Sequence, residues 1–315
     1  MHFLAEVIVT RPPSVLAALL RHRRSAILAV ALAGALLAAM PLDSIAQQTV
    51  RYVRFAHEER TAWGVVDGES IRELAEAPWM SLRETGRRIA RSSARLLAPV
   101  EPSKIIAAGL NYRSHIGTRA VPAYPGLFAK YPTSIIGPDD EILLPHDAGN
   151  VHYEGELVVV IGRTARDVPI GEALSYVFGV TAGNDVSERD WQAADLQWLR
   201  AKASDGFAPI GPVLVTGLNP EDLLVQTRVN GETRQSERTK DLLFGVAHLI
   251  SYISRYITLV PGDVIFTGTP QTTRAIQPGD VVEIEVEGVG VLRNRVNRKG
   301  EGEGEFEFEF EFEGE

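Results

Sequence analysis

The sequence contains no cysteine. This absence excludes disulfide bonds, a thiol nucleophile and a zinc site with cysteine ligands, so a bound metal ion would need oxygen or imidazole ligands. A basic stripe with interleaved aromatic residues, which is typical of nucleic-acid-binding proteins, is also missing. So is a βαβ pattern with a phosphate-binding glycine loop. The sequence therefore gives no support for a nucleic acid or a nucleotide as a partner.

The apolar run near the N-terminus is too short for a good membrane span. It covers Ala26–Met40, follows basic residues at 21–24, and precedes Ser44-Ile45-Ala46, a pattern suited to signal peptidase. Together these features predict a signal peptide with an N-terminal extension over residues 1–46. An uncleaved anchor and a buried helix are the alternatives. The Arg23-Arg24 pair suggests the twin-arginine route, so we expect an exported, periplasmic protein without a stable membrane span after cleavage.

The composition is ordinary for a folded soluble protein, since 45% of the 315 residues are hydrophobic and 23% are charged. The formal net charge of −9 says little about partners, because part of the acidity lies in a low-complexity Glu/Phe/Gly tail over residues 298–315. We expect a small β-rich region over residues 47–103 and a main domain over residues 104–297. An arginine-rich stretch near Ser81–Leu97 predicts a helix that links the two.

Short β-branched runs broken by Gly and Pro predict a β-dominated α+β main domain. Two Pro-Gly-Asp turns, at 261–263 and 278–280, are predicted to introduce strands. An apolar face at helical spacing predicts one clear helix from Asp241 to Tyr256. The predicted strands include Leu157–Ile161, Pro212–Val215, Val264–Thr267 and Val281–Val286.

Two glutamates, Glu154 and Glu156, stand at the start of an apolar run that predicts a buried strand. Residues i and i+2 of a strand point to the same face, so these carboxylates lie together, repel each other and lose hydration. A divalent cation would neutralise them, and hard oxygen ligands favour Mg²⁺, Mn²⁺ or Ca²⁺. A solvated acidic strand edge is the alternative. Asp185 lies where another apolar segment meets a loop, and this third carboxylate favours the metal site.

Four segments carry a more specific signal. They are Gly-Leu-Asn-Tyr-Arg-Ser-His at 109–115, Tyr-Glu-Gly-Glu-Leu-Val-Val-Val-Ile-Gly at 153–162, Asn-Asp-Val-Ser-Glu-Arg-Asp-Trp-Gln at 184–192 and Pro-Gly-Asp-Val-Ile-Phe-Thr-Gly-Thr-Pro at 261–270. In this order and spacing they resemble the fumarylacetoacetate hydrolase family over about residues 104–296. The resemblance implies a mixed β-roll or sandwich domain, a homodimer, and a divalent metal ion, usually Mg²⁺. On this chain the metal ligands would be Glu154, Glu156 and Asp185.

The resemblance also implies roles for further side chains. His115 matches a general base on a mobile lid, and Lys202 matches a lysine that faces the negative charge developing on the substrate. Arg189 and Gln192 match residues that contact the substrate or a metal-bound water. Thr269 matches a threonine that binds a substrate carboxylate or oxo group. Tyr112 and Arg113 flank the lid histidine and are further candidates for substrate binding.

One departure from the family pattern bears on the reaction. Many hydrolases of the family place a glutamate three residues after the lid histidine, and this chain has Thr118 there. The resemblance implies a metal-dependent hydrolase that cleaves a C–C bond in an acylpyruvate- or 1,3-diketone-type acid through a metal-stabilised enolate. The alternatives are an isomerase or tautomerase, an oxaloacetate-type decarboxylase, and a non-catalytic protein that binds metal and ligand. In each case the expected partner is a small oxo acid.

Overall fold

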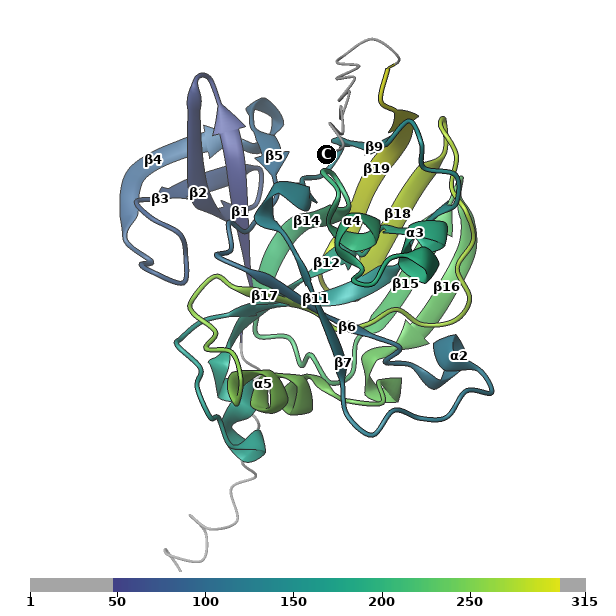
Figure 1. The fold of residues 1–315 in the computed structure, drawn as a ribbon. Coiled ribbons are helices and arrows are strands. Elements are labelled where there is room, and N and C mark those ends of the chain that lie inside the picture. The colour runs from purple at the N-terminus through teal and green to yellow at the C-terminus, as the bar shows by residue number, and fades with distance from the viewer. Residues whose placement is uncertain (1–47, 301–315) are drawn as a thin grey trace, which may run out of the picture. The chain divides into compact units, whose positions relative to one another are not determined.

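The computed structural model describes residues 48–300. The predicted signal peptide and nearly all of the predicted tail lie outside the described residues. Among the residues described, no helix is both long enough and apolar enough to cross a membrane. Strands dominate this range and form a large sheet, a five-stranded sheet and a two-stranded sheet (Figure 1).

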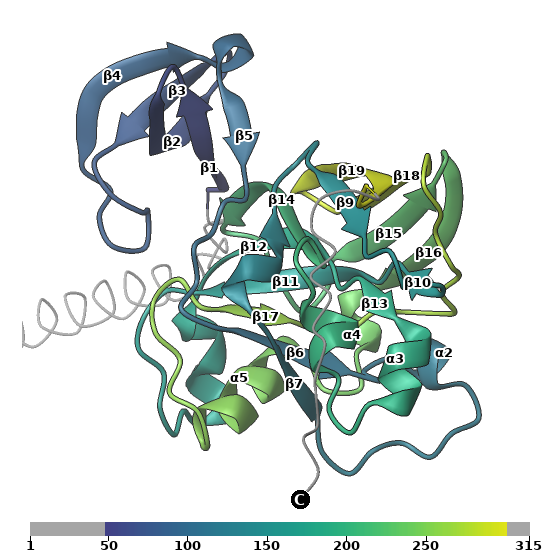
Figure 2. The same ribbon diagram turned by 45° about the horizontal axis from the view of Figure 1, so that its top comes forward.

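The N-terminal part is an antiparallel meander of short strands. Its elements are β1 (Val50–His57), β2 (Arg60–Asp67), β3 (Ser70–Leu74), β4 (Glu84–Ala90), the 3-10 turn η1 (Arg91–Ser93) and β5 (Arg95–Leu97). β1 joins this meander to the main domain, because its first residues pair with β14 (Ala208–Thr216), Tyr52 opposite Leu214. In Figure 2 the meander stands at one end of the large sheet.

The prediction of a helix near Ser81–Leu97 is wrong, since this segment forms β4, η1 and β5. Gly86 has a φ of +86°, a value that a right-handed helix does not accommodate. Ile89 is the buried residue of β4 and pairs with Ile71 of β3. Ile89 is the one fully buried residue of this segment, so no helical stripe packs on the core here. The edge of β3 offers backbone hydrogen-bond partners instead.

The large sheet follows the order β4-β3-β2-β1-β14-β12-β11-β17-β6-β7, with β5 and β8 paired beside β1 and β14. Its central strand, β11 (Gly155–Ile161), is buried along its whole length. Leu157 and Val159 belong to the hydrophobic core that also contains the buried residues of the five-stranded sheet, and Val158 and Val160 belong to a second core. Burial of both faces explains why β11 reads as a continuous apolar run. The other strands here are β6 (Ile105–Gly109), β7 (Gly126–Lys130), β8 (Ile135–Ile136), β12 (Val177–Asn184) and β17 (Val264–Phe266).

The five-stranded sheet follows the order β16-β15-β18-β19-β9. Its members are β9 (Glu141–Leu144), β15 (Leu224–Val229), β16 (Glu232–Arg238), β18 (Val281–Val286) and β19 (Gly290–Arg298). Burial alternates along β15 and β18, so one face of this sheet packs on the core. The approach to β11 is very close, since a Cβ on Gly155 would lie 2.0 Å from Thr227 Oγ1 of β15. Both predicted Pro-Gly-Asp turns are confirmed, with φ values of +91° at Gly262 and +96° at Gly279.

The helices are short. The helix predicted over Asp241–Tyr256 is confirmed in its middle as α5 (Val246–Ser254), whereas Asp241 ends the 3-10 turn η4 (Thr239–Asp241) and Gly245 precedes the first turn of α5. The remaining elements are α2 (Arg113–Ile116), α3 (Arg189–Ala194), α4 (Leu199–Ala203), η2 (Pro132–Ser134), η3 (Ile170–Tyr176), and the paired strands β10 (Val151–His152) and β13 (Ser187–Glu188).

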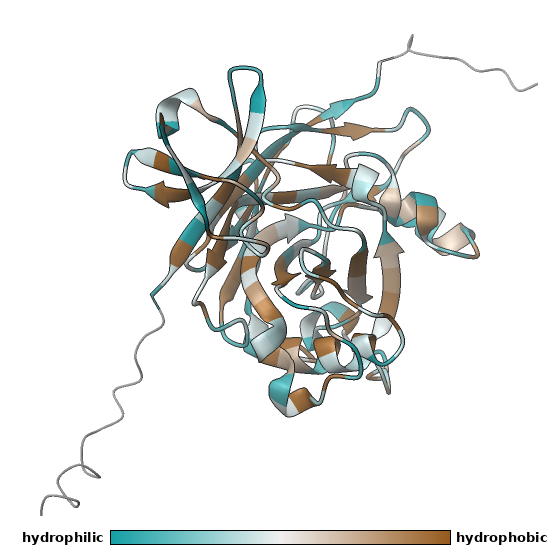
Figure 3. Ribbon diagram, turned by 90° about the vertical axis from the view of Figure 1, so that its left-hand side faces the viewer, coloured by the Kyte–Doolittle hydropathy of each residue, from teal (hydrophilic) through white to brown (hydrophobic). Residues whose placement is uncertain are grey.

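The predicted fold class, a β-dominated α+β domain with mixed sheets, is confirmed. Most neighbouring strands are antiparallel, and the pairs β6–β17, β8–β14 and β9–β19 are parallel. In Figure 3 the apolar residues, in brown, gather on the central strands, and polar residues, in teal, are frequent in the loops. Polar residues buried in this apolar interior are expected to have hydrogen-bond or ion-pair partners.

Candidate metal centre and substrate cavity

The pairing of β11 with β12 brings three carboxylates together. Glu154 and Glu156 lie at the start of β11, and Asp185 follows the last residue of β12. The Asp185 amide donates to the Glu154 carbonyl over 2.8 Å, which fixes the two chain segments against each other. One ligand oxygen from each acid lies within 4.8 Å of the others. Because the three residues are at most 5% exposed, the alternative of a solvated acidic edge is wrong.

Three basic side chains contact these carboxylates. The Lys202 ammonium, on α4, lies 2.8 Å from Glu154 Oε2 and 3.0 Å from Asp185 Oδ2. Arg189, on α3, donates from Nη2 to Glu154 Oε1. The Lys130 ammonium, at the end of β7, lies 2.6 Å from Asp185 Oδ1. Since buried charges are tolerated when they are paired and hydrogen-bonded, these contacts explain how Glu154 and Asp185 remain in the interior.

The two glutamates differ in their electrostatic surroundings. Burial opposes ionisation of Glu154, but the charges of nearby basic groups, Lys202 first, outweigh burial and hold its pKa below the ordinary value. For Glu156, burial and then the charge of Asp185 raise the pKa well above the ordinary value. Glu156 accepts a hydrogen bond from the Gly268 amide over 2.6 Å, but within residues 48–300 it forms no ion pair. A divalent cation beside Glu156 would offset this like-charge repulsion.

The donor set fits a hard divalent cation. Carboxylate oxygens are the ligands that Mg²⁺ and Mn²⁺ prefer, and in the described part of the chain this triad is the one cluster of candidate ligands close enough to share an ion. The same place already holds positive charge, because the Lys202 ammonium bridges two of the acids. The triad of Glu154, Glu156 and Asp185 could therefore bind a metal ion.

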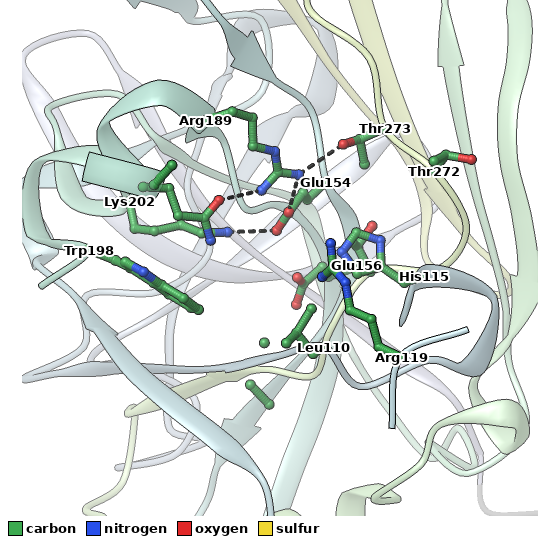
Figure 4. Close-up of a pocket in the computed structure, with 15 residues that line it drawn as sticks. Leu110, His115, Arg119, Glu154, Glu156, Arg189, Trp198, Lys202, Thr272 and Thr273 are labelled. Atoms are coloured by element: carbon green, nitrogen blue, oxygen red, sulfur yellow. Dashed lines mark hydrogen bonds and ion pairs between the residues drawn. The ribbon is translucent and has the colours of Figure 1, made fainter. Parts of the chain in front are cut away.

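A cavity of about 400 Å³ opens beside the carboxylates. In Figure 4, Lys202 and Trp198 lie on one side of Glu154, and His115 and Arg119 lie on the other. The predicted site residues that line the cavity are His115, Glu154, Glu156, Arg189, Gln192, Lys202 and Thr269. The other lining residues are Ala108, Gly109, Leu110, Arg119, Ala193, Trp198, Thr272 and Thr273.

Arg189 and Gln192 reach the cavity from α3. The helix begins at this point because the Glu188 carboxylate caps it, accepting from the Trp191 amide over 2.6 Å. Arg189 Nη1 donates to Gln192 Oε1, and its Nη2 donates to Thr273 Oγ1, both over 2.8 Å. With Glu154 as a further acceptor, these bonds fix the direction of the guanidinium within the cavity.

Two predicted substrate contacts do not reach the cavity wall. Tyr112 is 1% exposed and forms a β-bridge with Leu242. Arg113 is exposed and donates from Nη1 to the Arg119 carbonyl over 3.2 Å. Asp185 also lies behind the wall, where the two lysines hold it. The structure therefore places Tyr112 and Arg113 as supports of the segment around α2.

Thr269 lies in the cavity wall, but its hydroxyl is already engaged. Thr269 Oγ1 donates to the Gly155 carbonyl over 3.0 Å and accepts from Gln235 Nε2 over 2.8 Å. Gln235, on β16, is fully buried, and its Oε1 accepts from the Gly155 amide over 3.1 Å. Since a hydroxyl has one proton to donate, donation to a substrate would require the bond to Gly155 to break. Gln235 could not be predicted from the sequence, because no local signal separates it from the other polar residues of β16.

His115 lies on α2, half-buried at the cavity wall. Its Nδ1 contacts the Gln271 carbonyl. Because a carbonyl can only accept, Nδ1 carries the proton and Nε2 is unprotonated in the neutral ring. Within residues 48–300, the histidines with a carboxylate at ion-pair distance are His57 and His146, not His115. The group that orients this imidazole is therefore a backbone carbonyl and not an acid.

Lys130 is a further site residue, which the sequence did not predict. Its ammonium is fully buried, contacts Asp185 Oδ1 and also donates to the Lys202 carbonyl. Burial lowers the pKa of Lys130, and the charge of Asp185 opposes this change. The one signal in the sequence was a lysine at the end of an apolar strand. Because a lysine is rarely buried without a partner, this position could have indicated a buried acid nearby. Its partner, 55 residues away in sequence, could not be read from that signal.

Replacement of Lys130 with methionine is expected to lower the free energy of unfolding by about 2–3 kcal/mol, because Asp185 would lose one fully buried charged partner and keep Lys202 as the other. Chemical denaturation of the purified variant measures this loss. Lys240→Met is the matched control, since Lys240 is exposed. Equal denaturation midpoints for the two variants would show that the buried pair does not support the fold.

Two family models match the chain. Residues 104–297 match the model described as fumarylacetoacetate (FAA) hydrolase C-terminal, and residues 50–99 match the model described as Rv2993c-like, N-terminal. The chain is 44% identical over 263 residues to Protein Rv2993c of Mycobacterium tuberculosis, which covers 80% of this chain and 99% of that protein. It is 40% identical over 222 residues to the mitochondrial oxaloacetate tautomerase Fahd2a of Rattus norvegicus, which covers 66% of this chain and 71% of that protein.

Solved structures give the same result. The 2-hydroxyhepta-2,4-diene-1,7-dioate isomerase from Mycobacterium marinum has a TM-score of 0.75 and 43% identity, covering 80% of this chain and 99% of that one. A maleylpyruvate hydrolase from Sphingobium sp. SYK-6, in complex with manganese(II) and pyruvate, has a TM-score of 0.67 and 29% identity, covering 79% of this chain and 100% of that one. The chain therefore belongs to the fumarylacetoacetate hydrolase family.

Proposed function

We propose that this protein is a metal-dependent isomerase or tautomerase, which moves a proton on a small 2-oxo acid by way of its enolate. The observation that carries the proposal is the state of His115, whose Nδ1 proton is held by the Gln271 carbonyl at the cavity wall. Nε2 is then the unprotonated ring nitrogen and can accept a proton from the substrate. An imidazole in this state can remove a proton from a carbon next to a carbonyl.

The basic side chains of the cavity support the same chemistry. Lys202 and Arg189 present fixed positive charge at Glu154 (Figure 4). Preorganised donors of this kind stabilise the negative charge that develops on a substrate oxygen. A divalent cation bound by the three carboxylates would supply Lewis-acid stabilisation of that charge. We propose Mg²⁺ as the resident ion, with Mn²⁺ as a substitute, in line with the manganese(II) in the maleylpyruvate hydrolase structure.

Hydrolysis of a C–C bond in an acylpyruvate-like acid is the second candidate, and the likeness to the maleylpyruvate hydrolase supports it. This reaction needs an activated water, and within residues 48–300 no carboxylate lies at ion-pair distance from the His115 imidazole to assist it. Thr118, three residues further on, carries no charge. The relatives named as an isomerase and a tautomerase also share more sequence with this chain, 43% and 40%, against 37% and 29% for two neighbours named as hydrolases. Proton transfer is therefore the favoured reaction.

Two other candidates remain for the test to separate. Decarboxylation of an oxaloacetate-like acid passes through the same enolate and needs no attacking water. A non-catalytic binding protein would need the carboxylates but would not need an oriented base such as His115 in the cavity wall.

We also propose that the protein is exported to the periplasm and acts as a homodimer. The basic and apolar N-terminal segment supports export. Membership of the family supports the homodimer. Cell fractionation and light scattering of the purified protein test the two proposals separately.

The test of the proposed reaction is proton exchange in heavy water. With Mg²⁺ or Mn²⁺ present, the protein should speed the loss of the C3 proton signal of oxaloacetate, followed by nuclear magnetic resonance, beyond the rate with metal alone. Chelation of the metal should abolish this acceleration. His115→Gln should slow the exchange by about 100-fold or more, because a general base typically contributes that much, while the melting temperature stays unchanged.

The same samples separate the alternatives. Cleavage of an acylpyruvate faster than proton exchange would establish the hydrolase, and release of CO₂ from oxaloacetate at the enzymatic rate would establish the decarboxylase. If no reaction exceeds the metal-only rate, although ligand still binds, the protein is a binding protein.

A further inference from the structure

We infer that Arg119 binds a second carboxylate on the substrate, so that this site selects 2-oxo dicarboxylic acids over 2-oxo monocarboxylic acids. The inference rests on the proposed function for the identity of the oxo acid, and it adds a specificity residue to that site.

The backbone around α2 aims Arg119 at the cavity. Gly117, with a φ of +59°, ends α2 and turns the chain. The Arg119 amide then donates to the Ile116 carbonyl over 3.2 Å, and its carbonyl accepts from Arg113 Nη1 over 3.2 Å. Both bonds involve the backbone of Arg119, so they hold its position while its guanidinium stays unengaged. Figure 4 shows this side chain beside His115, directed toward Glu156.

Arg119 differs from the other basic groups of the cavity in its partners. Lys202 is committed to Glu154 and Asp185, and Arg189 contacts Glu154 as well. Arg119, by contrast, forms no ion pair and no side-chain hydrogen bond within residues 48–300. It is exposed while it lines the cavity. A guanidinium with its N–H groups free can bind a carboxylate through two parallel hydrogen bonds.

The sequence neighbours of Arg119 carry no acid that could pair with it. Residues 116–125 contain no aspartate or glutamate, and Thr118 beside Arg119 is uncharged. In Figure 4, Arg119 and Lys202 lie on opposite sides of the two glutamates. A 2-oxo acid whose first carboxylate lies near Lys202 would extend toward Arg119. Its far end would then lie beside the positive charge of the Arg119 guanidinium. An apolar end of the substrate would leave that charge without a partner, which is the basis of the selection.

The experiment compares two ligands that differ by one group. Dimethyloxaloacetate and trimethylpyruvate both lack a proton on the carbon next to the oxo group, so neither can undergo the proposed proton transfer, and one carries a carboxylate where the other carries a methyl group. Calorimetry soon after mixing, with Mn²⁺ present, gives both dissociation constants. The full-length protein should prefer dimethyloxaloacetate by roughly 10- to 100-fold, the range expected for hydrogen bonds to a charged group.

Arg119→Met should reduce this preference to under about 3-fold, and Arg119→Lys should retain part of it, because lysine keeps the charge and loses the paired geometry. Arg166→Met, at an exposed arginine outside the cavity wall, is the control and should keep the full preference. An undiminished preference in Arg119→Met, no preference in the unmodified protein, or no binding of either ligand would overturn the inference. A preference that depends on Arg119, together with no proton exchange on oxaloacetate, would instead reject the proposed reaction and keep the subsite.

Discussion

Glu156→Gln is expected to weaken metal binding by at least about 100-fold without weakening the fold. The glutamine can still accept from the Gly268 amide, which the glutamate does over 2.6 Å. The substitution removes one of the three clustered negative charges. Burial and the charge of Asp185 disfavour the ionised form of Glu156 more clearly than that of the other two acids. The melting temperature of the metal-free variant should therefore stay equal or rise by about 2–4 °C, as a gain of about 1 kcal/mol would produce.

The effect on the ion should be opposite and large. Loss of residues that merely support a metal ligand typically costs 10- to 100-fold in affinity, so loss of a ligand should cost at least about 100-fold. Titration of Mn²⁺, followed by electron paramagnetic resonance, measures the affinity without relying on turnover. Mn²⁺ should raise the melting temperature of the unmodified protein and of the exposed control Glu172→Gln, but not that of Glu156→Gln. Unchanged Mn²⁺ affinity in Glu156→Gln would show that the triad is not the metal site.

Gly155→Ala should give the largest loss of stability among single-methyl additions at the site. A Cβ at this position would lie 2.0 Å from Thr227 Oγ1 and 3.0 Å from Ile284 Cδ1, both in the interior. Two packed sheets would have to separate, and overpacking of a core typically costs 1–3 kcal/mol, so we expect about 3 kcal/mol. Because Gly155 joins the two glutamates of the candidate metal site, Mn²⁺ affinity should fall with stability.

The neighbouring threonine provides a rescue. Thr227→Ala removes the nearest atom, so Gly155→Ala with Thr227→Ala should recover part of the stability that Gly155→Ala loses. Gly149→Ala is the matched control, since its added Cβ would meet nothing within 4 Å. Urea denaturation of the four variants gives the comparison. If Gly155→Ala is as stable as Gly149→Ala, the close contact between β11 and β15 is not a constraint on this position.

Local sequence patterns predicted those parts of the site that depend on one strand or one turn. The alternation rule placed Glu154 and Glu156 side by side, since it needs no knowledge of distant contacts. Asp185 joined them because β11 and β12 are antiparallel neighbours. The resemblance to the family supplied Lys202 and Arg189, whose places in the cavity no periodicity could have given.

The features that escaped prediction depend on contacts between distant segments. Lys130 reaches the site from β7, and Gln235 reaches it from the second sheet, 80 residues from Gly155 in sequence. Arg119 was overlooked because its direction depends on the turn at Gly117. In each case the sequence near the residue shows only an ordinary polar side chain, and its role depends on tertiary contacts.

Errors in the secondary structure have a similar cause. The arginines near Ser81–Leu97 favoured a helix by composition, but the available partner was the edge of β3, and tertiary pairing outweighed propensity. The helix expected from Asp241 begins five residues later, at Val246, because Gly245 marks its start. The continuous apolar run of β11 was predicted correctly as a strand. A short run of this kind is typical of a strand that is buried on both faces.

The pairing of β1 with β14 has a consequence for how the chain can be divided. The two matched family regions meet near residue 100, yet a shared ladder of hydrogen bonds crosses that boundary at Val50, Arg51 and Tyr52. A fragment cut at the family boundary would leave residues 214–216 as an open strand edge. Open edges recruit strands from other molecules, so we expect the fragment of residues 104–297 to aggregate more readily than the chain that keeps β1 on this edge.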